Sequence, residues 1–110
     1  MSQDSNAVPA VSQAFQTFLT DAPAQANAWM QAVEVLSRVS ALDQKTAALA
    51  YLAVLAALRL ESGVPFHVGL AKRAGATRAE VVSAILVGLP AAGNAVTQCL
   101  PAALSAYDAG

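Results

Sequence analysis

The side chains in this sequence that are suited to acid–base chemistry gather around a single histidine. His67 is the only histidine among the 110 residues, and Glu61 precedes it by six positions. A carboxylate that orients an imidazole is a familiar general base. One hypothesis therefore pairs Glu61 with His67 across a helix break at residues 61–63, and the alternative leaves Glu61 as a solvated residue in a turn.

The position of His67 also bears on its charge. It falls in the first turn of a helix expected over residues 64–74, where the positive end of the helix dipole disfavours the imidazolium. A neutral imidazole can act as a base, a hydrogen-bond donor or a metal ligand, or it can be a buried remnant with one hydrogen bond. If the preceding helix flanks a pocket with this one, Tyr51, Leu60 and Gly63 would line it; otherwise Tyr51 is a core residue.

The residue types give little support for a metal site or for thiol chemistry. One histidine and one nearby glutamate are too few ligands for a metal ion, so we expect no metal and no cofactor. Cys99 is the only cysteine of the chain. We expect it to be a small buried hydrophobic residue on the last helix, and a peroxidatic role with a thiol from another subunit is the less favoured alternative.

Composition narrows the class of protein. The net charge is −1 and the six Lys and Arg residues are scattered apart from one adjacent pair, which argues against nucleic-acid binding and against an electrostatic membrane anchor. The longest apolar run, 47–58, is shorter than the roughly 20 residues that cross a bilayer. Because residues 1–10 lack the basic and apolar regions of a signal peptide, we expect a cytoplasmic protein.

The apolar content is high for a protein of this size. Hydrophobic residues make up 56% of the chain and charged residues 12%, against about 25% charged in an average soluble domain. One explanation is the alanine content, because alanine raises the hydrophobic percentage while adding little apolar surface area. We favour the other explanation, that some faces are buried against further copies of the chain, which predicts a homo-oligomer.

The hydrophobic periodicity predicts helices throughout, organised around the run at 44–60. A helix that is apolar all round belongs inside a core or an assembly. No strand pattern or repeat is present, so we predict an all-α bundle of five or six helices. It would form one domain over residues 8–110, preceded by a disordered tail at 1–7. The other expected helices lie at about 9–20, 22–39, 64–74, 77–87 and 95–107.

On the second of these helices, an apolar stripe is expected to face the core. Its members are Trp29, Met30, Val33 and Leu36. Asp21 is expected to cap the start of this helix.

Helix ends in the second half of the chain are marked by capping residues. Gly75 suits the left-handed conformation that follows a helix C-terminus. Thr77 and Glu80 form a predicted capping box, which makes Glu80 structural rather than catalytic. Pro90 must interrupt or kink the helix before it, and Pro101 either kinks the last helix or sets its start.

Several of these segments together resemble one protein family. The segment 42–46 opens the long helix, His67 follows in the next helix, and the turn 74–80 (AGATRAE) precedes an apolar helix at 81–89. This layout resembles the AhpD-like (carboxymuconolactone decarboxylase) family, with weaker similarity from about 11 to 107. The resemblance implies a small all-helical protein that assembles as a homotrimer or homohexamer.

The resemblance also implies a chemistry that the residues here do not support. Peroxidases of this family carry Cys-x-x-Cys-x-x-x-His and a glutamate one helix earlier. Counted back from His67, the cysteine positions fall on Leu60 and Gly63, and the glutamate position falls on Ala48. The decarboxylase branch has a glutamate where this chain again has Gly63. A two-thiol peroxidase cycle within one chain is therefore excluded.

Three hypotheses for the function follow. The first is a thiol-independent small-molecule pocket around His67, with an acid–base or binding role. The second is a non-catalytic oligomeric family member that keeps only the fold. The third is weak antioxidant peroxidase activity through Cys99. The sequence leaves open whether the protein is an enzyme.

Overall fold

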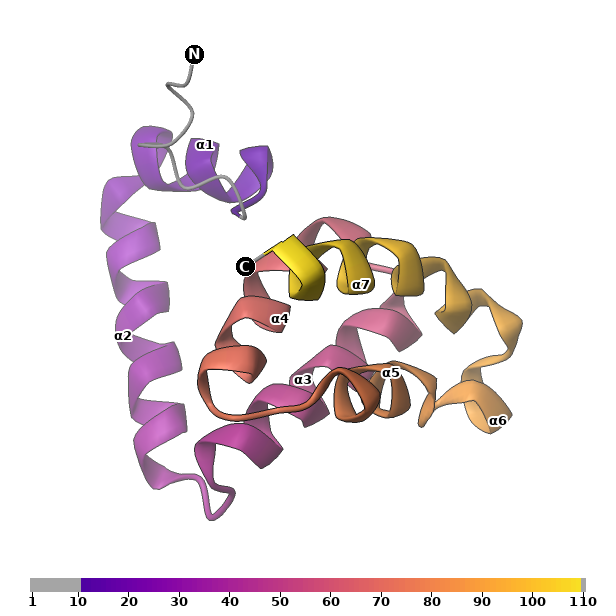
Figure 1. The fold of residues 1–110 in the computed structure, drawn as a ribbon. Coiled ribbons are helices and arrows are strands. Elements are labelled where there is room, and N and C mark those ends of the chain that lie inside the picture. Colours follow the sequence, from indigo (N-terminus) through magenta and orange to yellow (C-terminus); the bar gives the residue numbers. More distant parts are fainter. Residues whose placement is uncertain (1–10, 110) are drawn as a thin grey trace. The chain divides into compact units, whose positions relative to one another are not determined.

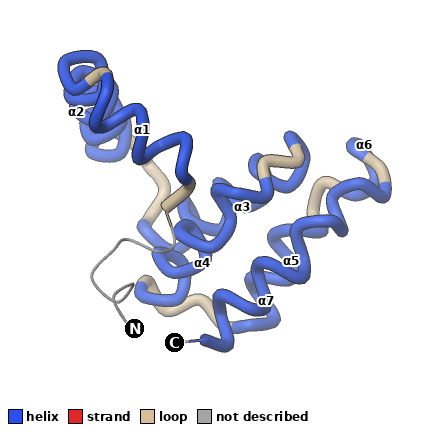
Figure 2. The backbone as a smooth tube through the Cα atoms, turned by 90° about the horizontal axis from the view of Figure 1, so that it is seen from above, coloured by secondary structure: helices blue, strands red, loops and turns tan. Residues whose placement is uncertain are grey.

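The structure is a computed structural model that describes residues 11–109. Every regular element in this range is helical, which confirms the all-α prediction (Figures 1 and 2). The predicted tail at 1–7 lies outside the described residues. The helices of nine or more residues are α1 (Gln13–Asp21), α2 (Pro23–Val39), α3 (Gln44–Leu58), α4 (Val64–Arg73), α5 (Arg78–Leu86) and α7 (Leu100–Ala109). The shorter elements are η2 (Glu61–Gly63), α6 (Leu89–Ala92) and η3 (Asn94–Cys99).

The chain divides into two compact units between Asp43 and Gln44. The first unit contains α1 and α2, and the second contains α3 to α7. One domain spanning residues 8–110 stays a prediction.

The first unit is a pair of helices joined by a very short turn. Ser12 caps α1, because its hydroxyl accepts a hydrogen bond from the backbone N–H of Phe15 at 3.1 Å. Asp21 does not cap α2, so that prediction was wrong. It is the last residue of α1, which leaves Ala22 at the cap position and Pro23 in the first turn of α2.

The apolar stripe of α2 is exposed rather than buried. Trp29 keeps 54% of its surface exposed and Leu36 67%, and Ala26 is the one buried residue of this helix. No core forms around the stripe within the first unit, so the prediction that it faces the core of the bundle stays a prediction. The physical reason is that the partner, α1, has 9 residues against the 17 of α2 and cannot cover its length.

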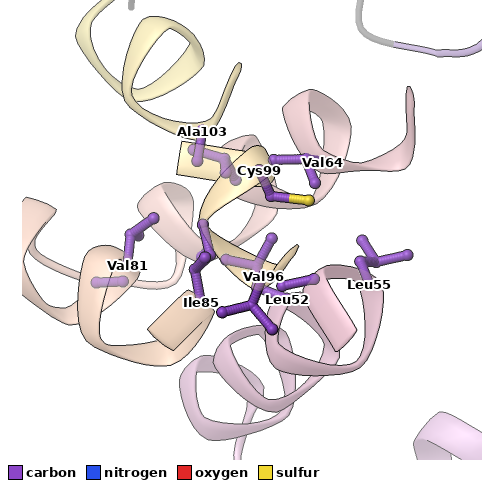
Figure 3. Close-up of a cluster of buried hydrophobic side chains, with 12 residues drawn as sticks. Leu52, Leu55, Val64, Val81, Ile85, Val96, Cys99 and Ala103 are labelled. Atoms are coloured by element: carbon purple, nitrogen blue, oxygen red, sulfur yellow. The ribbon is translucent and has the colours of Figure 1, made fainter. Parts of the chain in front are cut away.

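The hydrophobic core belongs to the second unit, where α3 packs against α4 and α5 and α7 packs across both of those helices. Fully buried side chains from each of these helices and from η3 meet there (Figure 3). They include Leu52, Ala56, Val64, Val68, Val81, Ile85, Val96, Cys99 and Ala103.

Two left-handed residues set the ends of α3 and α4. Arg59 has φ 59°, and the backbone N–H of Leu60 donates to the carbonyl of Leu55 at 2.9 Å, which closes the C-terminus of α3. Gly75 has φ 98° after α4, as predicted, and the N–H of Ala76 donates to the carbonyl of Ala71. The first turn brings α4 back onto α3, and the second leads from α4 into α5.

The predicted capping box is present at the start of α5. The N–H of Glu80 donates to the Thr77 hydroxyl at 3.0 Å, and the N–H of Thr77 donates to the Glu80 carboxylate at 2.9 Å. Lys45 of α3 pairs with the same carboxylate at 3.0 Å. These contacts lower the pKa of Glu80, the hydrogen bond from the Thr77 backbone most strongly, and they confirm its structural role.

Pro90 and Pro101 lie at helix starts, where a missing N–H removes no helical hydrogen bond. Pro90 lies in the first turn of α6, after α5 has ended at Leu86. Pro101 is the second residue of α7, so it sets the start of the last helix rather than kinking it.

The end of α7 is fastened to the turn between α4 and α5. The Tyr107 hydroxyl donates to the Ala76 carbonyl at 2.8 Å, and Lys72 Nζ donates to the Tyr107 carbonyl at 2.7 Å. Arg78 and Asp108 form a two-point ion pair at 2.9 and 3.0 Å. Together these bonds fix the position of α4 relative to the rest of the second unit, and α4 carries His67.

Candidate functional site

The structure brings Tyr51 and His67 into direct contact. The two rings, one on α3 and the other in the first turn of α4, have centroids 4.2 Å apart at an interplanar angle of 43°. Phe66 lies beside the imidazole on the same helix, edge to face at 5.2 Å. Tyr51 remains 46% exposed, so the pair lies at the surface of the second unit rather than in its core.

The surroundings of His67 favour its neutral form. The residue is partly buried, and this burial lowers the pKa of the imidazole below its ordinary value of 6.5. Burial removes water that would solvate the cation, and the positive end of the α4 dipole acts in the same direction. At neutral pH the ring therefore carries a lone pair that can accept a proton or a hydrogen bond.

Glu61 lies in η2, immediately before α4, and it is exposed. Among residues 11–109 it forms no hydrogen bond or ion pair with His67. Its negative charge acts instead on Cys99, where it adds to a rise in the pKa of the thiol. The proposed carboxylate–imidazole pair is thus not assembled in this conformation of the chain.

Leu60 and Gly63 occupy the two positions that correspond to the thiols of peroxidases in the family that this sequence resembles. The Leu60 side chain is 49% exposed. A Cβ added to Gly63 would lie 3.4 and 3.6 Å from the methyl groups of Leu55, which is close to ordinary contact. An apolar surface therefore stands where a thiol pair would be, next to the η2 turn.

Cys99 is a core residue, as predicted. Its side chain is fully buried among the apolar residues of the second unit (Figure 3). Burial raises the pKa of the thiol, and Glu61 raises it further. A buried thiol that resists ionisation is a poor nucleophile, because the thiolate is the species that attacks peroxide.

A groove of about 620 Å³ lies between α3 and α5, away from these residues. It was not predicted from the sequence, although small residues one turn apart, Ala50 and Ala53 on α3 and Ala79 and Ser83 on α5, form a pattern that leaves such a space. Its one ionisable side chain, Glu80, is already bonded to Thr77 and Lys45. The groove could hold a ligand by its shape, but it has no acidic or basic side chain that is free to act on one. Its lining consists of Thr46, Leu49, Ala50, Ala53, Ala79, Glu80, Ser83, Ala84 and Val87.

Comparison with known protein families decides the relationship that the turn at 74–80 suggested. The profile of the carboxymuconolactone decarboxylase family matches residues 23–105, which is most of the chain. The chain belongs to this family. Comparison with curated proteins and with solved structures gave no match.

Two further features of the described residues bear on this family member. No group of three or more His, Cys, Asp or Glu side chains within residues 11–109 could hold a metal ion. No helix in that range is long and apolar enough to span a membrane.

Proposed function

We propose that this carboxymuconolactone decarboxylase family protein holds a small molecule at the Tyr51–His67 pair, without using thiols, and that it works as a homo-oligomer. The observation that carries the proposal is the contact between the two rings at 4.2 Å. It places a neutral imidazole and a phenol hydroxyl group on one accessible surface.

The Tyr51–His67 pair supplies a proton acceptor and a hydrogen-bond donor. The imidazole can accept a proton or a hydrogen bond from a ligand, since its pKa is lowered by burial. The phenol of Tyr51 can donate a hydrogen bond. Glu61 remains a candidate to orient His67 once a ligand is bound, because catalytic hydrogen bonds are often long or unformed in a free enzyme.

Self-association as a trimer or hexamer is the second part of the proposal. It is supported by the charged fraction of 12% and by large apolar side chains that remain exposed on α2, α3 and α4. A non-catalytic oligomer that keeps only the fold is the alternative, favoured by the separation of Glu61 from His67. Peroxidase activity through Cys99 is the weakest candidate, because that thiol is fully buried.

The binding site can be tested by NMR, because the chain has a single histidine and so a single set of imidazole signals. Benzoate and phenol serve as probes of a flat ring with and without a charge. We expect millimolar phenol or benzoate to shift the His67 signals in the wild type and the effect to be lost in Tyr51→Leu. The control Val87→Leu, at the residue that follows α5, should respond as the wild type does. Unchanged His67 signals with both probes would rule out the proposed pocket.

A further inference from the structure

Two side-chain hydrogen bonds join α4 and the turn after it to α7, and both involve Tyr107. Lys72, on α4, donates to the Tyr107 carbonyl at 2.7 Å, and its ammonium group lies 4.7 Å from the centre of the Tyr107 ring. The Tyr107 hydroxyl donates to the carbonyl of Ala76 at 2.8 Å. One residue of α7 thus contacts this part of the chain through its backbone oxygen, its ring face and its hydroxyl group.

The groups that Tyr107 joins are suited to a firm attachment. The Tyr107 carbonyl is one of the last four of α7, which have no N–H to accept from within the helix. The ammonium group of Lys72 lies at the negative end of the α7 dipole and over an aromatic face, and both positions favour a cation. Ala76 is only 3% exposed, so water can do little to replace the hydroxyl as the partner of its carbonyl.

The buried face of α4, by contrast, is apolar. Val64, Val68 and Ala71 are fully buried in the core of the second unit. Apolar contact is non-directional, so it holds a helix against its neighbours more firmly than it fixes the helix along its own axis. The hydrogen bonds to Tyr107 have defined lengths and directions, and they supply that axial position.

We propose that Tyr107 is a positioning residue for the Tyr51–His67 site, because it sets the axial position of the helix that carries His67. The inference rests on the proposed function, since it adds a distant residue to the same site. His67 lies five positions before Lys72, which is roughly 7.5 Å along a helix that rises about 1.5 Å per residue. Because α4 is unbroken from Val64 to Arg73, a displacement at Lys72 is transmitted to the imidazole.

The contact between the two rings is sensitive to such a displacement. Tyr51 lies on α3, so it does not move with α4, and the ring centroids are 4.2 Å apart. A gap wider by about 0.5–1 Å loses roughly a quarter to a half of the dispersion attraction between two atoms. A small shift of α4 therefore loosens the contact between the imidazole and the phenol ring while the core stays folded.

The neighbouring residue, Asp108, provides a matched control. It lies at the same end of α7, but its hydrogen bonds come from Arg78 of α5, at 2.9 and 3.0 Å. Asp108→Asn weakens that ion pair and leaves both bonds of Tyr107 in place. Tyr107→Phe removes only the hydroxyl that donates to Ala76. Lys72→Met is a second test variant, which removes the ammonium group that donates to the Tyr107 carbonyl.

The readout is the NMR spectrum of the free protein, in which His67 gives the one set of imidazole signals. Spectra are recorded at about pH 8, where an imidazole with a pKa at or below its ordinary value is neutral, so the signals do not report protonation. The difference between the wild type and Tyr51→Leu measures the shift that the Tyr51 ring causes. Nuclear Overhauser effects between the two rings report their contact directly, and circular dichroism confirms that each variant is folded.

We expect the His67 signals of Tyr107→Phe and Lys72→Met to move part of the way toward those of Tyr51→Leu, with weaker Overhauser effects between the rings. Asp108→Asn should keep the wild-type signals. Unchanged His67 signals in both test variants, or an equal displacement in Asp108→Asn, would overturn the inference, because loosening the end of α7 in general would then explain the result. The phenol and benzoate titration of the wild type is a separate test: a lack of response there would remove the proposed pocket and leave the role of Tyr107 in the ring contact to be decided by these spectra.

Discussion

Replacing Cys99 distinguishes a core residue from a working thiol. The side chain is fully buried among apolar neighbours in the second unit. Cys99→Ala removes the sulfur and leaves a small cavity, at a cost of about 1–2 kcal/mol of unfolding free energy. Cys99→Ser keeps the size but places a hydroxyl in the apolar core, where an unsatisfied polar group costs about 1–3 kcal/mol more. Serine, the closer isostere, should therefore be the more damaging replacement.

Thermal unfolding followed by circular dichroism measures this difference. For a domain of this size, each 1 kcal/mol of destabilisation lowers the melting temperature by about 4–8 °C, so the order of the two variants can be resolved. Peroxide consumption by wild type and Cys99→Ala should be equal. A serine variant as stable as the alanine variant, or a loss of peroxide consumption in Cys99→Ala, would refute the assignment of Cys99 to an inert core.

Three more predictions concern the core, a turn and the histidine. Ile85→Ala should cost about 3–4 kcal/mol in urea unfolding, because Ile85 is fully buried; the exposed Val87→Ala should cost less than about 0.5 kcal/mol, and similar losses in both would contradict the placement of the core. Gly75→Ala should cost about 1–2 kcal/mol through its φ of 98° alone, since a Cβ there has nothing within 4 Å; a thermal melt matching the wild type would argue against the left-handed turn. His67 binds protons more weakly when folded than when unfolded, since burial lowers its pKa below 6.5. The stability of the wild type relative to His67→Gln should therefore be full above pH 6.5 and decline as the pH falls below it, and a difference independent of pH between 5 and 8 would contradict the buried neutral imidazole.

Local features of the chain could be predicted from the sequence because they depend on hydrogen bonds between near neighbours. The capping box needs only Thr77 and Glu80, three residues apart, and the left-handed turn needs only Gly75 after a helical pattern. The failure at Asp21 is also local: α1 continued one residue further than its pattern indicated, and a residue inside a helix cannot cap the next one.

The candidate site was only partly predictable. The sequence placed His67 in the first turn of a helix and offered Tyr51 and Glu61 as partners, but spacing along the chain does not say which of the two lies against the ring. The reversal through Arg59 and η2 brings α4 back along α3, so Tyr51 meets the imidazole while Glu61 stays in the turn.

By itself, the sequence determined that this chain is helical and that it holds one thiol and one imidazole, because composition and short-range backbone bonding suffice for both. Only the tertiary structure decided which apolar faces are buried. The stripe on α2 and the run on α3 look equally suited to a core, yet α2 has a single buried residue and α3 supplies the centre of the second unit. Burial depends on which elements are available to pack on a face, and that depends on segments distant in the sequence.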